Sequence, residues 1–485
     1  MAGNKSFTME SAGQTHGLTG IFARRHMPAM NTSFFGELLQ SISERGRALI
    51  ERTRERRPAG EARAANFVEL CEALLSGRGE ASGVALAREI LAAYAKLKTG
   101  ERIAFFEALA ESFGPDRARL ARACAAYGRE PTDEAAAEVS EAAEPRRQEL
   151  IRRINLAPGA TGELVQMREH LLDALARRGD LAVVDRDFIH LLGSWFNRGF
   201  LVLKRIDWSM PAIVLEKIIR YEAVHEIQSW DDLRARIDPP DRRCYAFFHP
   251  ALVDEPLIFV EVALTRGIPG AIVPILQRDR VPLDPKDATT AAFYSISNCQ
   301  RGLGGVSFGN FLIKQVVEEI SREFPKLSTF VTLSPVSGFR EWLTRERRSE
   351  ASTALLPSDA RALSHLDDPD WFEHAEKVAE AKPVLSALAA HFFLIARTRA
   401  GRPIDPVARF HLGNGARLER INPMADLSER ALERAYGLMV NYRYELDDIE
   451  KNHEAFAGSG EVVASAQVRK LLRTDAKQTA LVPTP

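Results

Sequence analysis

The chain lacks the features that mark several large classes of protein. Its 485 residues include only four cysteines, and none of them has the CxxC spacing of a zinc or redox site. Basic and acidic residues balance at 65 against 66, so there is no basic excess to bind nucleic acid. The longest apolar run, 383–396, is too short to cross a bilayer. We therefore expect no nucleic-acid partner and no membrane span, and the scattered cysteines fit a reducing compartment.

The sequence also lacks targeting and metal-binding signatures. Residues 1–30 are polar and have no apolar segment of a secretory signal, so we expect a disordered tail. A cleaved organelle presequence is the alternative, and cytoplasm is the default location. No HExxH motif and no His, Asp and Glu grouping with metal spacing is present. We therefore expect no metal site.

Short amphipathic helices are predicted for the first part of the chain. Ala, Leu, Glu and Arg dominate from Phe34 to Arg178, and apolar residues recur at steps of three and four. In 82–97 this stripe follows Ser82, which we expect to be an N-cap. The acidic segment 131–145 fits either a solvated helix or a loop. We expect a helical bundle that serves as a scaffold or in assembly.

From about residue 180 the pattern changes to strands alternating with helices, which predicts an α/β domain. Strands are expected at 244–248, 256–264, 289–297, 328–334, 407–412 and 437–446. A helix beginning near Gly309 would place five apolar residues on one face: Ile313, Val316, Val317, Ile320 and Phe324. The apolar run 383–396 is expected to be a buried helix with Pro383 near its start.

A glycine-rich turn lies between the strand 289–297 and the helix near Gly309. Gly302, Gly304, Gly305 and Gly309 remove Cβ atoms where backbone N–H groups must approach a ligand, and the helix adds its N-terminal donors. The turn is neither a Walker loop nor a GxGxxG motif. It predicts either a phosphate-binding site or a tight turn that needs glycine for packing.

Three polar residues near predicted strand ends are candidates for chemistry. Ser334 ends the strand 328–334 without the GxSxG environment of a hydrolase nucleophile, and a turn-forming role is its alternative. His411 lies in an extended run before a Gly-Asn-Gly turn, where a structural histidine is the alternative. Tyr444 alternates with Tyr442 along a predicted strand, which favours packing over a polar wall.

An ordered set of motifs resembles the malonyl-CoA decarboxylase family. The segments are FYSIS (293–297), GLGGVSFGNFLIK (302–314), REFPKL (322–327), LSPVSGF (333–339), ARFHLGNGA (408–416), INPMAD (421–426) and NYRY (441–444). WFNRGFL (195–201) and EAVHEI (222–227) are similar to the same family. The resemblance is strong over about 190–450 and weaker in the helical part.

The resemblance implies a helical domain joined to a catalytic domain like the GNAT acetyltransferases, with a mixed central sheet. We accordingly expect a tail at 1–30, a helical domain at 31–190, a catalytic domain at 191–460 and a C-terminal helix and tail at 461–485. Members of the family convert malonyl-CoA to acetyl-CoA and carbon dioxide without a cofactor, and they are oligomeric. We expect homo-oligomerisation through the helical domain.

The resemblance also implies the site. Ser334 and His411 would form the catalytic pair, and the turn of Gly304, Gly305, Val306, Ser307, Phe308, Gly309 and Asn310 would bind coenzyme A. Ser295 and Tyr444 would lie beside the substrate. Loss of carbon dioxide leaves an enolate on the thioester, which needs stabilisation of its oxygen and a proton on its α-carbon. We expect His411 to donate this proton, although the reverse assignment within the pair is also open.

One departure from the family concerns the turn. Animal members carry glutamate in GVELG where this chain has Ser307 in GVSFG. Any role of that carboxylate would be absent here or taken over by another group. Two other functions fit the same turn: an acyl-CoA-dependent N-acyltransferase and a non-catalytic coenzyme A sensor.

Overall fold

The computed structural model of this chain describes residues 61–76, 80–306 and 312–473. Several expectations lie outside these residues. They are the tail 1–30, the part of the helical domain before residue 61, the chain end from 474, and four residues of the glycine-rich turn, Ser307, Phe308, Gly309 and Asn310.

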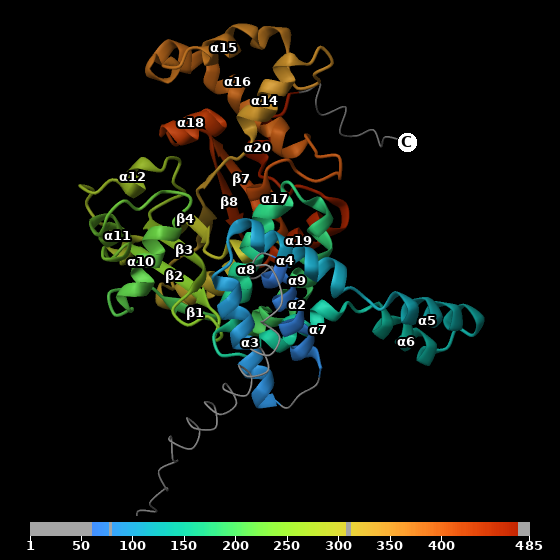
Figure 1. Ribbon diagram of the computed structural model, residues 1–485. Helices are drawn as coiled ribbons and strands as arrows, with labels where there is room; N and C mark the ends of the chain where they lie inside the picture. Colours follow the sequence, from blue (N-terminus) through green and yellow to red (C-terminus); the bar gives the residue numbers. More distant parts are fainter. Residues whose placement is uncertain (1–60, 77–79, 307–311, 474–485) are drawn as a thin grey trace, which may run out of the picture. The chain divides into compact units, whose positions relative to one another are not determined.

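The first part of the described chain is helical, as predicted (Figure 1). Its helices are α2 (Glu61–Leu75), α3 (Glu80–Ala95), α4 (Thr99–Ser112), α5 (Arg117–Arg129), α6 (Asp133–Ala143), α7 (Arg146–Ile154), α8 (Ala160–Leu175) and α9 (Ala182–Trp195). The acidic segment proves to be helix α6, because the Thr132 side chain caps it by accepting from the Ala135 N–H. Ser82 is not an N-cap, since α3 begins two residues earlier. The expected boundary at 190–191 lies within α9.

A mixed sheet follows, which confirms the expected fold class. In the described residues it has eight strands: β1 (Val202–Arg205), β2 (Arg242–Phe248), β3 (Pro256–Thr265), β4 (Thr290–Asn298), β5 (Thr329–Thr332), β6 (Ser334–Pro335), β7 (Arg417–Asn422) and β8 (Met439–Tyr444). Their order is β1-β2-β3-β4-β5-β8-β6, and β7 pairs with β8. β4 and β5 run parallel, and the other pairs are antiparallel.

Helices pack on both faces of this sheet. Successive side chains of each strand point to opposite faces, so neighbouring residues contact different helices. On β2, Cys244 and Ala246 join an apolar cluster with residues of α10 (Ala212–Tyr221) and α11 (Trp230–Ile237). Arg243 and Tyr245 point the other way and contact Glu323 of α13 (Leu312–Glu323). The predicted apolar face of α13 is confirmed for Ile313, Val316, Val317 and Ile320, which are buried. Phe324 follows the last residue of the helix and is partly buried.

The remaining helices follow β3 in the sequence and are labelled in Figure 1. They are α12 (Val273–Leu276), α14 (Phe339–Arg348), α15 (Ala360–Ser364), α16 (Ala375–Leu394), α17 (Pro406–Gly413), α18 (Glu429–Ala435), α19 (Ile449–Ser459) and α20 (Ala466–Leu471). Pro383 is inside α16 and not near its start. The helix begins earlier because 375–382 contains Ala, Glu and Lys, which are strong helix formers.

Two strand predictions need correction. Residues 407–412 form part of helix α17, because the Asp405 carboxylate accepts from the N–H groups of Val407 and Ala408 and Pro406 occupies the first helical position. The single strand expected at 328–334 is two strands. It breaks at Leu333, whose N–H donates to the Phe293 carbonyl at 2.9 Å, and Ser334 then pairs with Val440 of β8.

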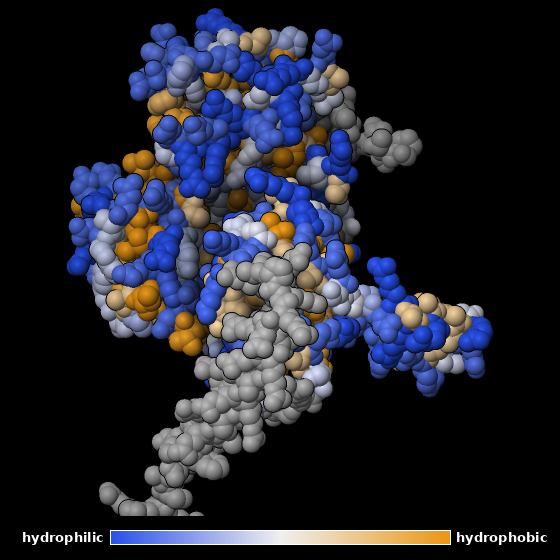
Figure 2. Space-filling model, in the orientation of Figure 1, coloured by the Kyte–Doolittle hydropathy of each residue, from blue (hydrophilic) through white to orange (hydrophobic). Residues whose placement is uncertain are grey.

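The surface is mainly polar on the face that Figure 2 shows, where apolar residues form separate small patches among hydrophilic ones. Within the described ranges, no helix combines the length and apolar character needed to span a bilayer.

Candidate active site

Ser334 and His411 come together in the interior, although 77 residues separate them. Ser334 lies at the start of β6 and is 6% exposed, and His411 is on α17 and 3% exposed. Ser334 Oγ is 3.2 Å from His411 Nε2. The turn of helix α17 that carries His411 therefore replaces the extended strand that we expected there.

Tyr444 completes a chain of polar side chains. Its hydroxyl is 2.8 Å from His411 Nδ1, so both nitrogens of the imidazole face hydroxyl groups. The imidazole also stacks on Tyr442, with ring centroids 4.7 Å apart and an interplanar angle of 25°. The alternation favoured packing for Tyr444, but its hydroxyl supplies a polar contact, and Tyr442 is the tyrosine that stacks on the ring.

Thr332 holds the serine and Asn441 holds Thr332, and sequence reasoning missed both roles. Ser334 Oγ donates to Thr332 Oγ1 at 2.8 Å, and Thr332 Oγ1 also accepts from the Tyr442 N–H. Asn441 Nδ2 donates to the Thr332 carbonyl at 2.8 Å. Thr332 is two residues before Ser334 and so shares its face of the strand, which is the one signal that pointed to it.

Asp405 joins the two halves of the site and was also missed. Besides capping α17, it accepts from the Ser337 N–H at 2.8 Å, three residues after Ser334. Burial raises the pKa of this carboxyl to about 6, and the backbone N–H groups of Ala408, Ser337 and Val407 oppose the rise. The Asp-Pro pair at 405–406 was the available signal, since it is typical of a helix start.

Burial determines the charge of the hydrogen-bonded group Ser334–His411–Tyr444. It lowers the pKa of His411 to about 3 and raises the pKa of Tyr444 above its ordinary value. The imidazole is therefore neutral at neutral pH. Because Ser334 donates to Thr332, the consistent direction has Tyr444 O–H donating to Nδ1 and Nε2–H donating to Ser334 Oγ.

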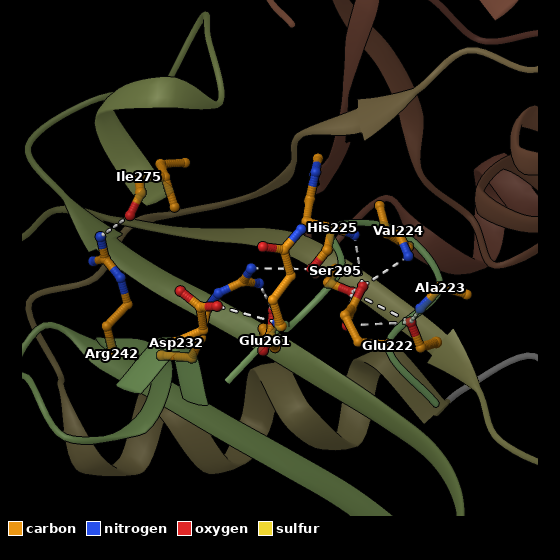
Figure 3. A network of polar contacts seen from close by, with 12 residues as sticks. Glu222, Ala223, Val224, His225, Asp232, Arg242, Glu261, Ile275 and Ser295 are labelled. Atoms are coloured by element: carbon orange, nitrogen blue, oxygen red, sulfur yellow. Dashed lines mark hydrogen bonds and ion pairs between the residues drawn. The ribbon is translucent and has the colours of Figure 1, made fainter. Parts of the chain in front are cut away.

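Ser295 lies in a different buried network, drawn in Figure 3. It is 1% exposed, and its hydroxyl lies 2.8 and 2.7 Å from the two carboxylate oxygens of Glu222. Glu222 also accepts from the N–H groups of Val224 and His225 at 2.7 and 2.8 Å. This carboxylate binds the segment after α10 to strand β4. It belongs to EAVHEI, but no spacing in the sequence indicated its contact with Ser295.

A buried ion pair continues the network. Arg236 Nη1 is 2.7 Å from Glu261 Oε2, and Glu261 is fully buried on β3. Burial raises the pKa of Glu261 to about 7, Arg236 opposes this rise, and the Glu222 carboxylate adds to it. Arg236 also donates to the His225 carbonyl at 3.0 Å.

The strand register relates the two groups. β4 and β5 pair as far as Phe293 and Thr332. Ser295 and Ser334 are each two residues beyond that last pair, on the two strands that separate there. Ser295 pairs instead with Glu261 across β3, and Ser334 with Val440 across β8.

In the described part of the glycine-rich turn, two backbone N–H groups donate to carbonyl groups three residues earlier in the same segment. The Gly304 N–H donates to the Arg301 carbonyl at 2.9 Å, and the Val306 N–H donates to the Leu303 carbonyl at 3.0 Å. Gly305 has a φ of 78°, a left-handed conformation that favours glycine. Binding of coenzyme A by this turn stays a prediction. In the parts of the chain that the structure describes, no group of three or more His, Cys, Asp or Glu residues is arranged to hold a metal ion.

Comparison with known proteins identifies the family. The model of the malonyl-CoA decarboxylase C-terminal domain matches residues 199–482, and that of its N-terminal domain matches residues 113–196. The mitochondrial malonyl-CoA decarboxylase of Anser anser anser is 37% identical over 418 residues, which cover 78% of this chain and 82% of the relative. The corresponding protein of Mus musculus is 35% identical over 413 residues, covering 77% and 82%.

Two crystal structures agree with this match. Malonyl-CoA decarboxylase from Rhodopseudomonas palustris is 59% identical, with a TM-score of 0.81 over 84% of this chain and 99% of that one. The enzyme from Agrobacterium vitis is 54% identical, with a TM-score of 0.81 over 84% and 100%. The chain therefore belongs to the malonyl-CoA decarboxylase family of carboxy-lyases.

Proposed function

We propose that this chain decarboxylates malonyl-CoA to acetyl-CoA and carbon dioxide, with Ser334 and His411 as its catalytic pair. The observation that carries the proposal is the buried hydrogen-bonded chain Ser334–His411–Tyr444 in a protein of this family. The carbon–carbon bond breaks, its electron pair moves into the thioester carbonyl to form an enolate, and carbon dioxide leaves. One proton then adds to the α-carbon, so the reaction consumes one proton. The thioester is itself the electron sink, and the proposal therefore requires no cofactor.

The two side chains have different parts in the proposal. The Ser334 hydroxyl contacts the departing carboxylate, and His411 delivers the proton. His411 is neutral before substrate arrives, because burial lowers its pKa to about 3. A carboxylate beside the ring stabilises the imidazolium and so raises that pKa, which allows His411 to take up the proton that it later donates. Tyr444 holds Nδ1 and keeps Nε2 directed at Ser334.

The test is incubation of the purified protein with malonyl-CoA. Decarboxylation produces acetyl-CoA and carbon dioxide, needs no acceptor and releases no free thiol. An N-acyltransferase would need an amine and release coenzyme A, and a sensor would bind the ligand without turnover. Absence of acetyl-CoA would overturn the proposal.

The catalytic pair is tested with matched variants. We expect Ser334→Ala and His411→Ala each to reduce turnover roughly tenfold to a thousandfold, with binding of coenzyme A mostly retained. Ser386→Ala and His391→Ala are the controls, because both residues are buried on α16 and neither contacts the pair. Wild-type turnover in either site variant would remove that residue from the mechanism.

Self-association through the helical part is also proposed. Sedimentation of the full chain at several concentrations tests it, and a monomer at all of them would contradict it.

A further inference from the structure

Helix α8 of the helical part contacts the start of the glycine-rich turn through a buried arginine. Arg168 is 1% exposed, and its Nη1 donates to the Gly302 carbonyl at 2.7 Å. Its Nε donates to Asp185 Oδ1 of α9 at 2.8 Å. A charged group removed from water in this way is costly unless it is paired and hydrogen-bonded, so both contacts constrain the position of the guanidinium.

The backbones of the two segments also touch. A Cβ atom on Gly302 would lie 2.0 Å from the Val165 carbonyl oxygen of α8. Only glycine permits this approach. The sequence left open whether Gly302 makes room for a ligand or for packing, and in the structure its missing side chain makes room for helix α8.

Neighbouring residues on the same face of α8 add two more contacts. Glu169 Oε1 accepts from the Gly302 N–H at 3.2 Å, and Asp173 pairs with Arg301 Nη2 at 2.8 Å. Val165, Arg168, Glu169 and Asp173 follow one another at helical steps, so they present one face to the turn. Both backbone polar groups of Gly302 are thus held by side chains of one helix.

This contact continues into the turn proposed to bind coenzyme A. The 3-10 turn η5 (Arg301–Leu303) contains Gly302, and the Arg301 carbonyl accepts from the Gly304 N–H. Gly304, Gly305 and Val306 follow directly. The position of α8 therefore determines where the glycine-rich turn begins.

We propose that Arg168 is a positioning residue for the coenzyme A part of the substrate, acting through Gly302. The helical part then belongs to the binding site and is more than a scaffold. The inference rests on the proposed function, specifically on coenzyme A binding by the turn. Arg168 touches no reacting atom, so its loss weakens ground-state and transition-state binding equally and changes KM rather than kcat.

Arg147 offers a matched control. It is also a buried arginine of the helical part, with a side chain 7% exposed, and it pairs with Asp187 between α7 and α9. Its ion pair does not involve the glycine-rich turn. Arg168→Met and Arg147→Met therefore remove the same chemical group from a buried ion pair in the same region.

The experiment measures KM and kcat for malonyl-CoA, Kd for free coenzyme A by calorimetry, and Tm. We expect Arg168→Met to raise KM and Kd about tenfold with kcat within about twofold of the wild type. Arg147→Met should lower Tm and leave KM and Kd unchanged. Arg168→Lys should recover part of the loss, because the ammonium can still donate to the Gly302 carbonyl.

A milder variant keeps the test decisive if Arg168→Met does not fold. Glu169→Ala removes the acceptor of the Gly302 N–H from a partly exposed position, and we expect KM to rise about threefold. Unchanged KM and Kd in the folded variants, or equal changes in Arg147→Met, would overturn the positioning role. If the wild type neither binds coenzyme A nor decarboxylates malonyl-CoA, it is the proposed function that fails.

Discussion

Two buried polar groups lie where strands β4 and β5 separate, and they differ in charge. Ser334, His411 and Tyr444 form a chain of hydroxyls and an imidazole that is neutral at neutral pH. Glu222, Glu261 and Arg236 form a network of carboxylates and a guanidinium, in which Ser295 donates to Glu222. Both groups are almost fully buried and each contains a serine two residues past the same strand pair.

This difference indicates different roles. Charges taken out of water are stable only when they are paired and hydrogen-bonded. In the network Arg236 pairs with Glu261 Oε2, and Glu222 accepts from Ser295 and from two backbone N–H groups. One oxygen of Glu261 stays without a hydrogen-bond partner in the described part of the chain. The printed contacts of the network hold β3, β4 and the segment after α10 in place. The neutral chain brings no charge of its own, so an anionic substrate would supply the charge there. We therefore expect substitutions in the Glu222–Glu261–Arg236 network mainly to lower stability. Substitutions in the Ser334–His411–Tyr444 group should mainly change turnover or pH dependence.

Breaking the ion pair should have the largest effect. At pH 8, above the Glu261 pKa of about 7, Arg236→Met leaves this buried carboxylate without its cation, and we expect the free energy of unfolding to fall by about 3–5 kcal/mol. Denaturant titration measures this change. The double variant Arg236→Met with Glu261→Met should recover most of the loss, because both charges are then absent. A loss below about 1 kcal/mol in the single variant would contradict the assigned role.

The next effect is a pH dependence from His411. The unfolded imidazole takes up a proton below its ordinary pKa of 6.5, but the folded one does so only near pH 3. The free energy of unfolding therefore decreases as pH falls below 6.5. Between pH 7 and pH 5 we expect the wild type to lose about 2 kcal/mol more than His411→Asn. Parallel unfolding curves for the two proteins across this range would show that His411 is not held neutral.

Glu261 should give the opposite sign. Its folded pKa is raised to about 7 from an ordinary value of 4.5, so it favours the folded state most below pH 4.5. That contribution is lost as pH rises towards 7. Comparison with Glu261→Gln isolates it, and a contribution that instead grew with pH would mean that Arg236 holds the folded pKa of Glu261 below its ordinary value.

Removing the tyrosine hydroxyl should have a smaller effect, on turnover. Tyr444→Phe removes one neutral hydrogen bond to His411 Nδ1, worth about 1 kcal/mol, and we expect a fivefold to tenfold loss of kcat. Tyr442→Phe is the matched control: the Tyr442 hydroxyl is buried on the same strand without a hydrogen-bond partner among the described residues. Equal losses in both variants would indicate packing and not orientation.

The smallest effect separates two roles of Ser295. Ser295→Ala removes one donor to Glu222, and we expect a loss of about 1 kcal/mol in the free energy of unfolding. KM for malonyl-CoA should stay near that of Ser386→Ala if the hydroxyl only holds Glu222. A raised KM with unchanged stability would favour the substrate contact implied by the family resemblance.

The sequence predicted some of these elements well. Period-two alternation located β8, and the three- and four-residue steps located α13, because these periods follow from backbone geometry. It failed at His411, where an extended reading of 407–412 ignored the capping signal of Asp405 and Pro406. The pairing of Ser334 with His411 came from family resemblance, since contacts across 77 residues leave no local pattern.

The sequence by itself determined the helical first part, the strands β2, β3, β4, β5 and β8 of the mixed sheet, and the family to which the residues around Ser334 and His411 belong. Only the tertiary structure decided that burial keeps the imidazole neutral, that Ser295 donates to Glu222, and that Gly302 is needed by helix α8. Periodicity and capping act over a few residues, so they can be read along the chain. Burial, pKa and close backbone approach depend on segments brought together from distant positions, and they exist only in the folded protein.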